Sequence, residues 1–255
     1  MWDNVDSILA RMTPITLQQM KDIRLMDRLD FKFIAPVSFL PDLLEGMESD
    51  FMVQEINNKR IAPYATQYFD TSDIGFFVMH QNGKLARQKI RIRSYLDSGI
   101  SFLEVKNKNN KGRTKKHRIP FDVQRVDSID DLNEKKDFLT NYSLFDVDSL
   151  VPMLENSFRR ITLVNNKKTE RITIDTNLSF SNFMTHRKEQ LDPFMILELK
   201  QDGCVHSHFR DVVSNLNIKQ SSFSKYCIGT VLTNSEVKYN RFKKKLIKLD
   251  KLINQ

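Results

Sequence analysis

Apolar and polar residues alternate with period two in several short segments, and this alternation is typical of β-strands with one buried face. In residues 87–95, Ile90 and Ile92 would point to one face of such a strand. The opposite face carries four cations: Arg87, Lys89, Arg91 and Arg93. Like charges along one face repel one another, so we expect this face to be fully solvated or to hold a strongly anionic partner.

The same alternation recurs in five further segments. One face of each is apolar or nearly so: Leu29, Phe31 and Phe33; Leu103 and Val105; His117 and Ile119; Ile172 and Ile174; Leu197 and Leu199. The opposite faces carry Arg28, Asp30 and Lys32; Phe102, Glu104, Lys106 and Lys108; Lys116 and Arg118; Arg171, Thr173 and Asp175; Glu198 and Lys200. An antiparallel sheet with one wet side is the alternative, but a wet side usually mixes both charge signs with Ser, Thr and Gln. The dominance of Arg and Lys therefore favours a bound polyanion.

The wider pattern predicts one α+β domain over residues 1–255. Strands are predicted near 28–34, 51–61, 65–70, 86–95, 100–107, 115–121, 157–165, 169–175, 179–184 and 194–200. Helices are predicted in an N-terminal segment, 1–26, broken near Pro14, and near 37–48, 128–140, 206–216, 222–233 and 235–255. Many antiparallel strands with helices outside them indicate a barrel or a strongly curved sheet.

Composition agrees with an anionic partner. The 40 basic and 32 acidic residues give a formal net charge of +8, which favours nucleic acid, phosphate compounds or an acidic membrane surface. Cys204 and Cys227 imply no disulfide framework, and a reducing compartment fits. No apolar run is long enough to span a bilayer, and the N-terminus lacks the apolar stretch of a secretory signal. We expect a cytoplasmic protein.

The last predicted helix, 235–255, is especially basic. Its cations are Lys238, Arg241, Lys243, Lys244, Lys245, Lys248 and Lys251, and Leu246, Leu249 and Ile253 form a partial apolar stripe. Two interpretations stay open: membrane association, through an anionic lipid surface or a membrane-protein partner, and packing of the helix against the domain. Lysine runs also suggest nucleic acid, but the alternating strands favour an enclosed chain of phosphates over any specific nucleic acid.

A closed sheet would give the cationic faces a meaning. They would line an interior, while residues such as Ile90 and Leu103 would face outer helices. Unpaired buried charges are costly, so such an interior needs counter-anions or a polyanionic ligand. A linear polyphosphate or the triphosphate of a nucleotide supplies the charge density and the acceptor oxygens that Arg and Lys bind.

A series of motifs between residues 26 and 230 carries a resemblance to a known family. They are Met26–Phe33, Gln67–Thr71, His80–Lys84, Lys89–Tyr95, Phe102–Lys106, Lys116–Arg118, Phe158–Arg160, Arg171–Thr176, Ile196–Lys200 and Phe223–Tyr226. In their order and charge types the chain resembles the polyphosphate-polymerase domain of the vacuolar transporter chaperone (VTC) family, within the triphosphate tunnel metalloenzymes.

The resemblance implies an antiparallel eight-stranded β tunnel, with surrounding helices, that binds ATP and inorganic polyphosphate. Carried over by position, the catalytic residues would be Lys32, Arg91, Arg93, Lys106, Lys116, Arg160 and Arg171. Further phosphate-binding residues would be Lys89, Lys200, Ser224 and Lys225. Glu198 would hold a divalent cation, Mn²⁺ or Mg²⁺. The implied reaction is transfer of the ATP γ-phosphoryl group to a growing polyphosphate, which needs alignment and charge neutralisation rather than a protein nucleophile.

Two departures from the family pattern bear on function. Related triphosphatases and cyclases have Glu-x-Glu-x-Lys on the first strand, where this chain has Arg28-x-Asp30-x-Lys32. Phe158 stands where polymerases often have Tyr, so one phenolic contact with phosphate would be absent. A tripolyphosphatase or nucleotide triphosphatase and a non-catalytic module for polyphosphate or inositol pyrophosphate are the alternatives; Arg28 argues against the first and Glu198 against the second.

Other polar residues have simpler interpretations. Glu104 and Asp30 could each ligate a metal, but an ion pair with the neighbouring cations is the preferred reading. Cys204-x-His206-x-His208 fits no standard zinc spacing, and we expect a surface turn leading into a helix there.

Overall fold

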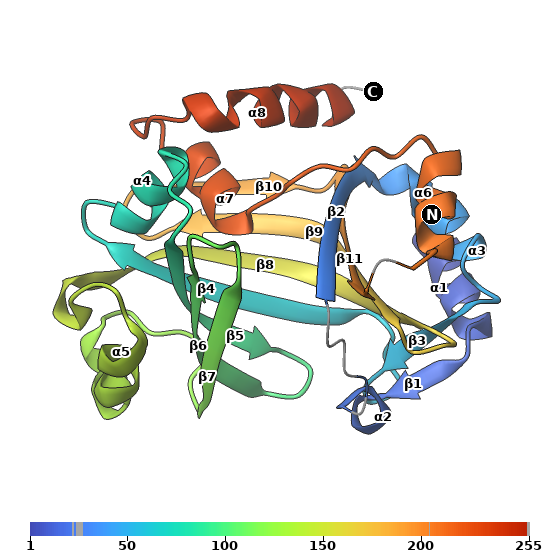
Figure 1. The fold of residues 1–255 in the computed structure, drawn as a ribbon, viewed down its shortest axis with the longest axis horizontal. Helices are drawn as coiled ribbons and strands as arrows, with labels where there is room; N and C mark the ends of the chain where they lie inside the picture. The colour runs from blue at the N-terminus through green and yellow to red at the C-terminus, as the bar shows by residue number, and fades with distance from the viewer. Residues whose placement is uncertain (22, 24–27, 204, 254–255) are drawn as a thin grey trace.

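The computed structural model describes residues 1–21, 23, 28–203 and 205–253 and shows a strongly curved antiparallel sheet with helices around it (Figure 1). The sheet has 11 strands. Its main path of hydrogen-bonded neighbours is β2 (Arg28–Pro36), β11 (Phe194–Asp202), β9 (Glu170–Asn182), β8 (Leu150–Asn165), β4 (Ala62–Thr71), β5 (Arg87–Tyr95), β6 (Ile100–Lys108) and β7 (Thr114–Phe121). Three short strands lie off this path: β1 (Pro14–Thr16), β3 (Phe51–Glu55) and β10 (Lys188–Leu191). The α+β class and the antiparallel architecture are confirmed.

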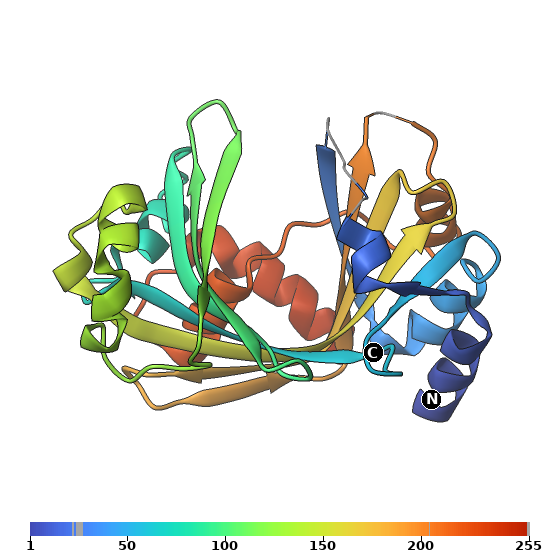
Figure 2. The same ribbon diagram turned by 90° about the horizontal axis from the view of Figure 1, so that it is seen from below.

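The expected closure of the sheet is not observed. Within the described residues no ladder joins β2 to β7, and Figure 2 shows the green β5–β7 arm and the arm of blue β2 and orange β11 rising separately. The free edge of β2 is covered by a loop instead. Gln220 forms a bridge with Phe33, and the Ser221 N–H donates to the Lys32 carbonyl at 2.8 Å. Since this loop takes backbone groups that a neighbouring strand would need, the sheet remains an open trough.

The helices agree broadly with the periodicity. Their bounds are α1 (Trp2–Arg11), α2 (Leu17–Lys21), η1 (Val37–Phe39), α3 (Leu40–Glu45), α4 (Gly75–Gln81), η2 (Asp130–Lys135), α5 (Lys136–Tyr142), η3 (Val147–Ser149), α6 (His208–Asn215), α7 (Lys225–Thr233) and α8 (Asn240–Ile253). The sequence pattern missed α4, β1 and β10. The predicted N-terminal segment ends in residues that lie partly outside the described ones.

Two apolar layers cover the convex side of the trough. Against one arm, α1, α3 and α6 pack on Ile172, Ile174, Leu197 and Leu199. Against the other, η2 and α5 pack on Ile90, Ile92, Leu103 and Val105. The apolar strand faces therefore meet outer helices, as the alternation predicted, and the charged faces are left on the concave side.

The concave side is divided between an apolar part and a charged part. Along one face of β11, Phe194 and Ile196 join a core with α7 and α8, whereas Glu198 and Lys200 lie beyond it. The same core contains Tyr64, Tyr68, Phe158 and Phe180 from the neighbouring strands. The helices α7 and α8 thus fill one part of the trough and leave the rest polar.

A bulge in β9 makes this division possible. The pattern predicted two strands, 169–175 and 179–184, but β9 is continuous, with its register against β8 shifted between Ser157 and Arg159. Asn177 adopts φ 51°, a left-handed conformation that Asn tolerates well. The extra residue changes the parity of the strand, so Asp175 before it and Leu178 after it both face the concave side.

The apolar stripe of the C-terminal helix is occupied by the domain. Phe242 and Leu249 are buried, and Leu246 and Leu252 pack against the same core. α8 begins at Asn240, five residues later than predicted, and has 14 residues. In the part of the chain that the structure describes, no helix has the length and apolar character needed to cross a membrane. Contact of the basic face of α8 with an anionic membrane stays a prediction.

Candidate functional site

A buried carboxylate joins two cations on the β5–β7 arm. The Arg91 Nε donates to Glu104 Oε2 at 2.8 Å, and the Lys116 ammonium contacts the other oxygen of the same carboxylate. The Glu104 side chain is 1% exposed. Burial alone would raise the pKa of Glu104, but the charges of Arg91, Arg93 and Lys116 outweigh burial and lower it to about 2. The preferred interpretation of Glu104, an ion pair, matches this geometry.

A second buried carboxylate fixes cations on β8 and α7. Asp175 accepts from Arg160 through both oxygens, at 2.5 and 2.7 Å, and Lys225 at the start of α7 contacts one of them. Burial would raise the pKa of Asp175, but Arg160 and Lys225 lower it strongly. The role of Asp175 was not predicted, although its shared strand face with Arg171 was an available signal in the sequence.

Glu198 is a further carboxylate of the concave face and is less engaged than Glu104 and Asp175. Its ion pair is with Lys32, its cross-strand partner, at 3.7 Å. The side chain is 22% exposed. Burial would raise the pKa of Glu198, but the charges of Lys32, Lys200 and Arg160 lower it to about 2. Its oxygens are therefore ionised and more available than those of Glu104 and Asp175.

Several cations of the concave face have no carboxylate within ion-pair distance among the described residues, and Arg93 and Lys106 are two of them. Arg93 is half-buried, its Nε has no hydrogen-bond partner, and desolvation together with Arg91 and Arg160 lowers its pKa. Burial and the charges of Arg91 and Lys89 lower the pKa of Lys106 to about 8. A half-buried guanidinium without a counter-charge is unfavourable in the empty protein, so Arg93 in particular indicates an anionic ligand, and Lys106 adds an unpaired positive charge beside it.

Because the sheet is curved, charged side chains on its two arms interact with one another. Lys106 on β6 interacts with Glu198 on β11 and with Lys32 on β2. Lys89 donates to the Ser224 hydroxyl at 3.0 Å, which ties β5 to the start of α7. We call the following set the cationic cluster: Lys32, Lys89, Arg91, Arg93, Lys106, Lys116, Arg160, Glu198, Lys200, Ser224 and Lys225.

Arg171 lies at the margin of this set. It is on the concave face of β9, and its cross-strand neighbour in the sheet is Lys200 on β11. Burial lowers the pKa of Arg171, and the nearby charge is that of Arg28. Arg28 itself pairs with Asp30 at 2.7 Å. The family resemblance placed Arg171 among the catalytic cations, and its charged neighbours in the structure are Lys200 and Arg28.

Two tyrosines on β4 were missed by the sequence analysis. Tyr68 is buried, and its hydroxyl interacts with the Arg91 guanidinium. Burial would raise the pKa of Tyr68, but Arg91, Arg93 and Lys89 lower it. Tyr64 stacks on Phe158, with ring centroids 5.3 Å apart. A phenolic hydroxyl is thus available in the cluster although Phe158 lacks one; the signal was the shared parity of Tyr64 and Tyr68.

The donors present fit a divalent cation held together with a ligand. Among the described residues no group of three or more His, Cys, Asp or Glu side chains could hold a metal alone. Mg²⁺-type sites commonly use one or two carboxylates and complete the shell with phosphate oxygens and water, and Glu198 suits that role.

The Cys204-x-His206-x-His208 segment has other contacts. His206 pairs with Asp211 at 2.9 Å and His208 contacts the Gly46 carbonyl at 2.8 Å, while Cys204 lies outside the described residues.

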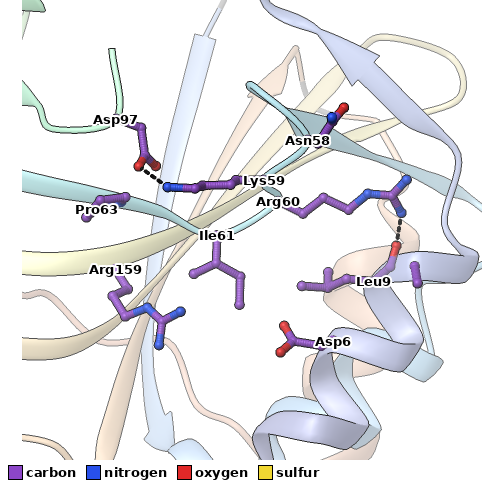
Figure 3. Close-up of a pocket in the computed structure, with 10 residues that line it drawn as sticks. Asp6, Leu9, Asn58, Lys59, Arg60, Ile61, Pro63, Asp97 and Arg159 are labelled. Carbon is purple, nitrogen blue, oxygen red and sulfur yellow. Dashed lines mark hydrogen bonds and ion pairs between the residues drawn. The ribbon is translucent and has the colours of Figure 1, made fainter. Parts of the chain in front are cut away.

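A surface cavity of about 610 Å³ lies outside the cluster, between α1 and the start of β4 (Figure 3). Its charged groups are largely engaged. Lys59 pairs with Asp97 at 2.7 Å, and Arg60 donates to the Leu9 and Met12 carbonyls at the end of α1 and to Glu55. Arg159, which also lines it, has the opposite parity to Arg160 and faces away from the cluster. This cavity therefore lies where α1 packs against the sheet, and the contacts of its charged side chains are structural.

The fold and the cluster define an α+β protein whose curved antiparallel sheet concentrates cations on its concave face. The chain belongs to the VTC domain family, whose family model matches residues 27–234. The match covers β2 to α7 and so includes every strand that contributes to the cationic cluster. No curated protein sequence matches the chain.

Among solved structures the chain is similar to three proteins described as putative adenylate cyclases. The one from Hippeastrum, described as having a dominant triphosphatase activity, has 13% identity and a TM-score of 0.49, covering 82% of this chain and 97% of that one. The protein from Vibrio parahaemolyticus has 11% identity and a TM-score of 0.46, and the match covers 79% of this chain and 96% of that one. The protein from Bacillus halodurans has 14% identity and a TM-score of 0.45, and the match covers 78% of this chain and 96% of that one.

Proposed function

We propose that this protein is a metal-dependent polyphosphate polymerase that uses ATP. The observation that carries the proposal is the convergence of cations from both arms, with Arg93 and Lys106 lacking carboxylate partners. A triphosphate or polyphosphate supplies oxygens that neutralise several such cations at once, which a small anion does not. Membership of the VTC domain family supports the same substrate class.

In the proposed reaction, an oxygen of the terminal phosphate of the polyphosphate attacks the γ-phosphorus of ATP. The bond from that phosphorus to the β,γ-bridging oxygen breaks, and ADP leaves. Arg91, Arg93 and Lys106 would align the phosphates and stabilise the charge on the transferred group. Ser224 and Lys225 would bind another phosphate at the start of α7, where helix N–H groups favour anions.

Glu198 would hold the divalent cation, Mn²⁺ or Mg²⁺, which when bound neutralises charge on the phosphate oxygens. A two-metal hydrolase is less well supported, because Asp30, the acid remaining on the first strand, is paired with Arg28 at 2.7 Å. Triphosphate hydrolysis and binding without turnover are the outcomes that the experiment below must separate.

The test is incubation of the purified chain with ATP and Mn²⁺ or Mg²⁺, with products separated on a polyphosphate gel. We expect a ladder of polyphosphate that depends on the added metal and is lost in Glu198→Gln. Glu189→Gln is the matched control, since Glu189 is exposed on β10, away from the cluster. Release of phosphate without a ladder would indicate a triphosphatase, and unchanged ATP would indicate a binding module.

A further inference from the structure

The concave face becomes aromatic at one end of the cationic cluster. On β5, Arg91, Arg93 and Tyr95 follow one another on this face, and the cross-strand partner of Arg93 is Phe102 on β6. The Tyr95 and Phe102 rings meet edge to face, with centroids 6.1 Å apart and planes at 84°. Tyr95 also contacts the buried Tyr64 ring at 5.0 Å, so the aromatic end is held by the core of the trough.

These two rings are accessible, unlike the neighbouring rings of Tyr64 and Phe158 on the same face. Tyr95 and Phe102 are half-buried, whereas Tyr64 and Phe158 are buried. The neighbouring Ile100 is 50% exposed. From β7, the exposed Arg118 places its guanidinium 4.6 Å from the centre of the Phe102 ring. The Arg118 guanidinium and the accessible rings of Tyr95 and Phe102 therefore lie next to Arg93. Arg93 has no ion-pair partner among the described residues.

We propose that Tyr95, Phe102 and Arg118 form the subsite for the nucleobase of a nucleoside triphosphate whose phosphates occupy the cationic cluster. The inference rests on the proposed function and deepens it. A nucleoside triphosphate carries its charge at one end and a flat aromatic ring at the other, and the concave face has the same order of features. Residues two apart on a strand are about 7 Å apart, so one residue pair separates the Arg93 level from the Tyr95 level, a distance that a ribose can span.

The chemistry of the subsite is stacking. Aromatic rings and guanidinium planes stack on nucleobases whatever their sequence of donors and acceptors. Tyr95, Phe102 and Arg118 offer such surfaces but few acceptors that would distinguish one base from another. The subsite therefore selects nucleotides over inorganic triphosphate and tolerates both adenine and guanine.

The subsite also gives the bound nucleotide a direction. With the base at Tyr95, the phosphates run along β5 from Arg93 towards Lys89, and the reacting end lies near Lys89, Lys106 and the start of α7. The growing polyphosphate is then extended at the end of the cluster opposite to the aromatic residues.

Titration calorimetry of the full chain with ATP, GTP and inorganic tripolyphosphate, at one salt concentration, tests the inference. The variant is Tyr95→Leu/Phe102→Leu, which keeps apolar side chains at both half-buried positions. We expect its affinity for ATP and for GTP to fall about tenfold or more, since base stacking supplies that much, while tripolyphosphate affinity stays within about twofold. Lys106→Gln is the matched control, and it should weaken all three ligands.

The outcomes separate the two proposals. Unchanged ATP affinity in the double variant, or equal losses for ATP and tripolyphosphate, would overturn the nucleobase subsite. Failure of the unaltered chain to bind ATP, GTP and tripolyphosphate alike would overturn the proposed function itself. Thermal melts of the double variant without ligand establish that it is folded, and the single variants Tyr95→Leu and Phe102→Leu serve if it is not.

Discussion

At the scale of single residues, Arg91 and Arg93 show how two similar side chains acquire different environments. Both lie on the concave face of β5, and the alternating pattern treats them alike. Arg91 is paired with Glu104, so its pKa is raised although burial would lower it. Arg93 has no such partner and its pKa is lowered. Arg91 therefore contributes an ion pair to the empty protein, whereas Arg93 has no counter-charge among the described residues.

The first prediction compares alanine substitutions at these positions. Arg91→Ala should lower the free energy of unfolding by about 2–3 kcal/mol, because Glu104 remains buried with Lys116 as its only ion-pair partner among the described residues. Arg93→Ala should leave it unchanged or raise it, since a half-buried, uncompensated cation is removed. Each should weaken tripolyphosphate binding by about 2 kcal/mol. Urea unfolding and calorimetry measure the two effects, and equal destabilisation by both variants would contradict this assignment.

The second prediction concerns Glu104 and pH. A carboxylate whose pKa is lowered on folding contributes stability above its unfolded pKa and loses it as pH falls through the folded one. With a folded pKa of about 2, the Glu104 contribution should disappear as pH falls from about 4.5 to 2. Glu104→Gln should lower stability at pH 7 by about 3 kcal/mol and flatten the acid limb. Unfolding curves at several pH values, with Glu189→Gln as the control, would reveal a difference or its absence.

At the scale of elements, α7 links the apolar and charged parts of the concave face. Its first turn holds Ser224 and Lys225 in the cluster, and its middle packs on β8 and β9. A buried carboxylate also fixes this helix: Asp70 accepts from the Tyr226 hydroxyl and from the Phe76 and Phe77 N–H groups at the start of α4. The phosphate-binding turn is thus positioned by the core beneath it.

The third prediction uses the close approach of α7 to the sheet. A Cβ on Gly229 would lie 2.4 Å from a Phe180 ring carbon and 2.6 Å from a Leu154 methyl carbon. Gly229→Ala should cost about 1–3 kcal/mol through overpacking and should weaken tripolyphosphate binding, because the displaced helix carries Lys225. Ser214→Ala, at an exposed position of α6, is the control. Thermal melting and calorimetry decide; undiminished stability would show that the helix can move without loss.

At the scale of the whole molecule, the curved sheet makes charges from distant segments act on one another. Lys106 on β6 is influenced by Arg91 and Lys89 on β5 and by Lys32 and Glu198 on the opposite arm. The low pKa of Lys106 follows from desolvation and from the charges of Arg91 and Lys89 on the neighbouring strand, with Lys32 on the opposite arm adding to the shift and Glu198 opposing it. The response of this lysine to pH therefore depends on both arms of the trough.

The fourth prediction follows from that pKa of about 8. Tripolyphosphate affinity should fall as pH rises through 8, because Lys106 loses its proton while the phosphates are already ionised. For the empty protein the sign is opposite: between pH 8 and about 10.5 the unfolded chain holds more protons on this lysine, so its contribution to stability rises with pH. Lys106→Gln should remove both dependences. Calorimetry from pH 6.5 to 9.5 would contradict the prediction if affinity stayed flat.

Period-two alternation in the sequence was sufficient to assign the two faces of the strands. Because side chains alternate strictly along an extended chain, Ile90 and Ile92 could be assigned to the covered side and Arg91 and Arg93 to the charged side without coordinates. Most strand positions, the antiparallel α+β class and the membership of the VTC domain family followed from the same segments and their order.

Tertiary structure alone decided which charges are paired. Ion pairs join residues far apart in sequence, such as Asp175 with Lys225, and they depend on how α7 packs into the trough. The bulge at Asn177 changes which residues of β9 share a face, and a period-two pattern does not reveal where the count shifts. The edge of β2 is bordered by the loop at 220–221 and not by β7, and this loop is distant from β2 in sequence. Local alternation fixes direction, but distance between segments is set only by packing, and electrostatic energy depends on distance.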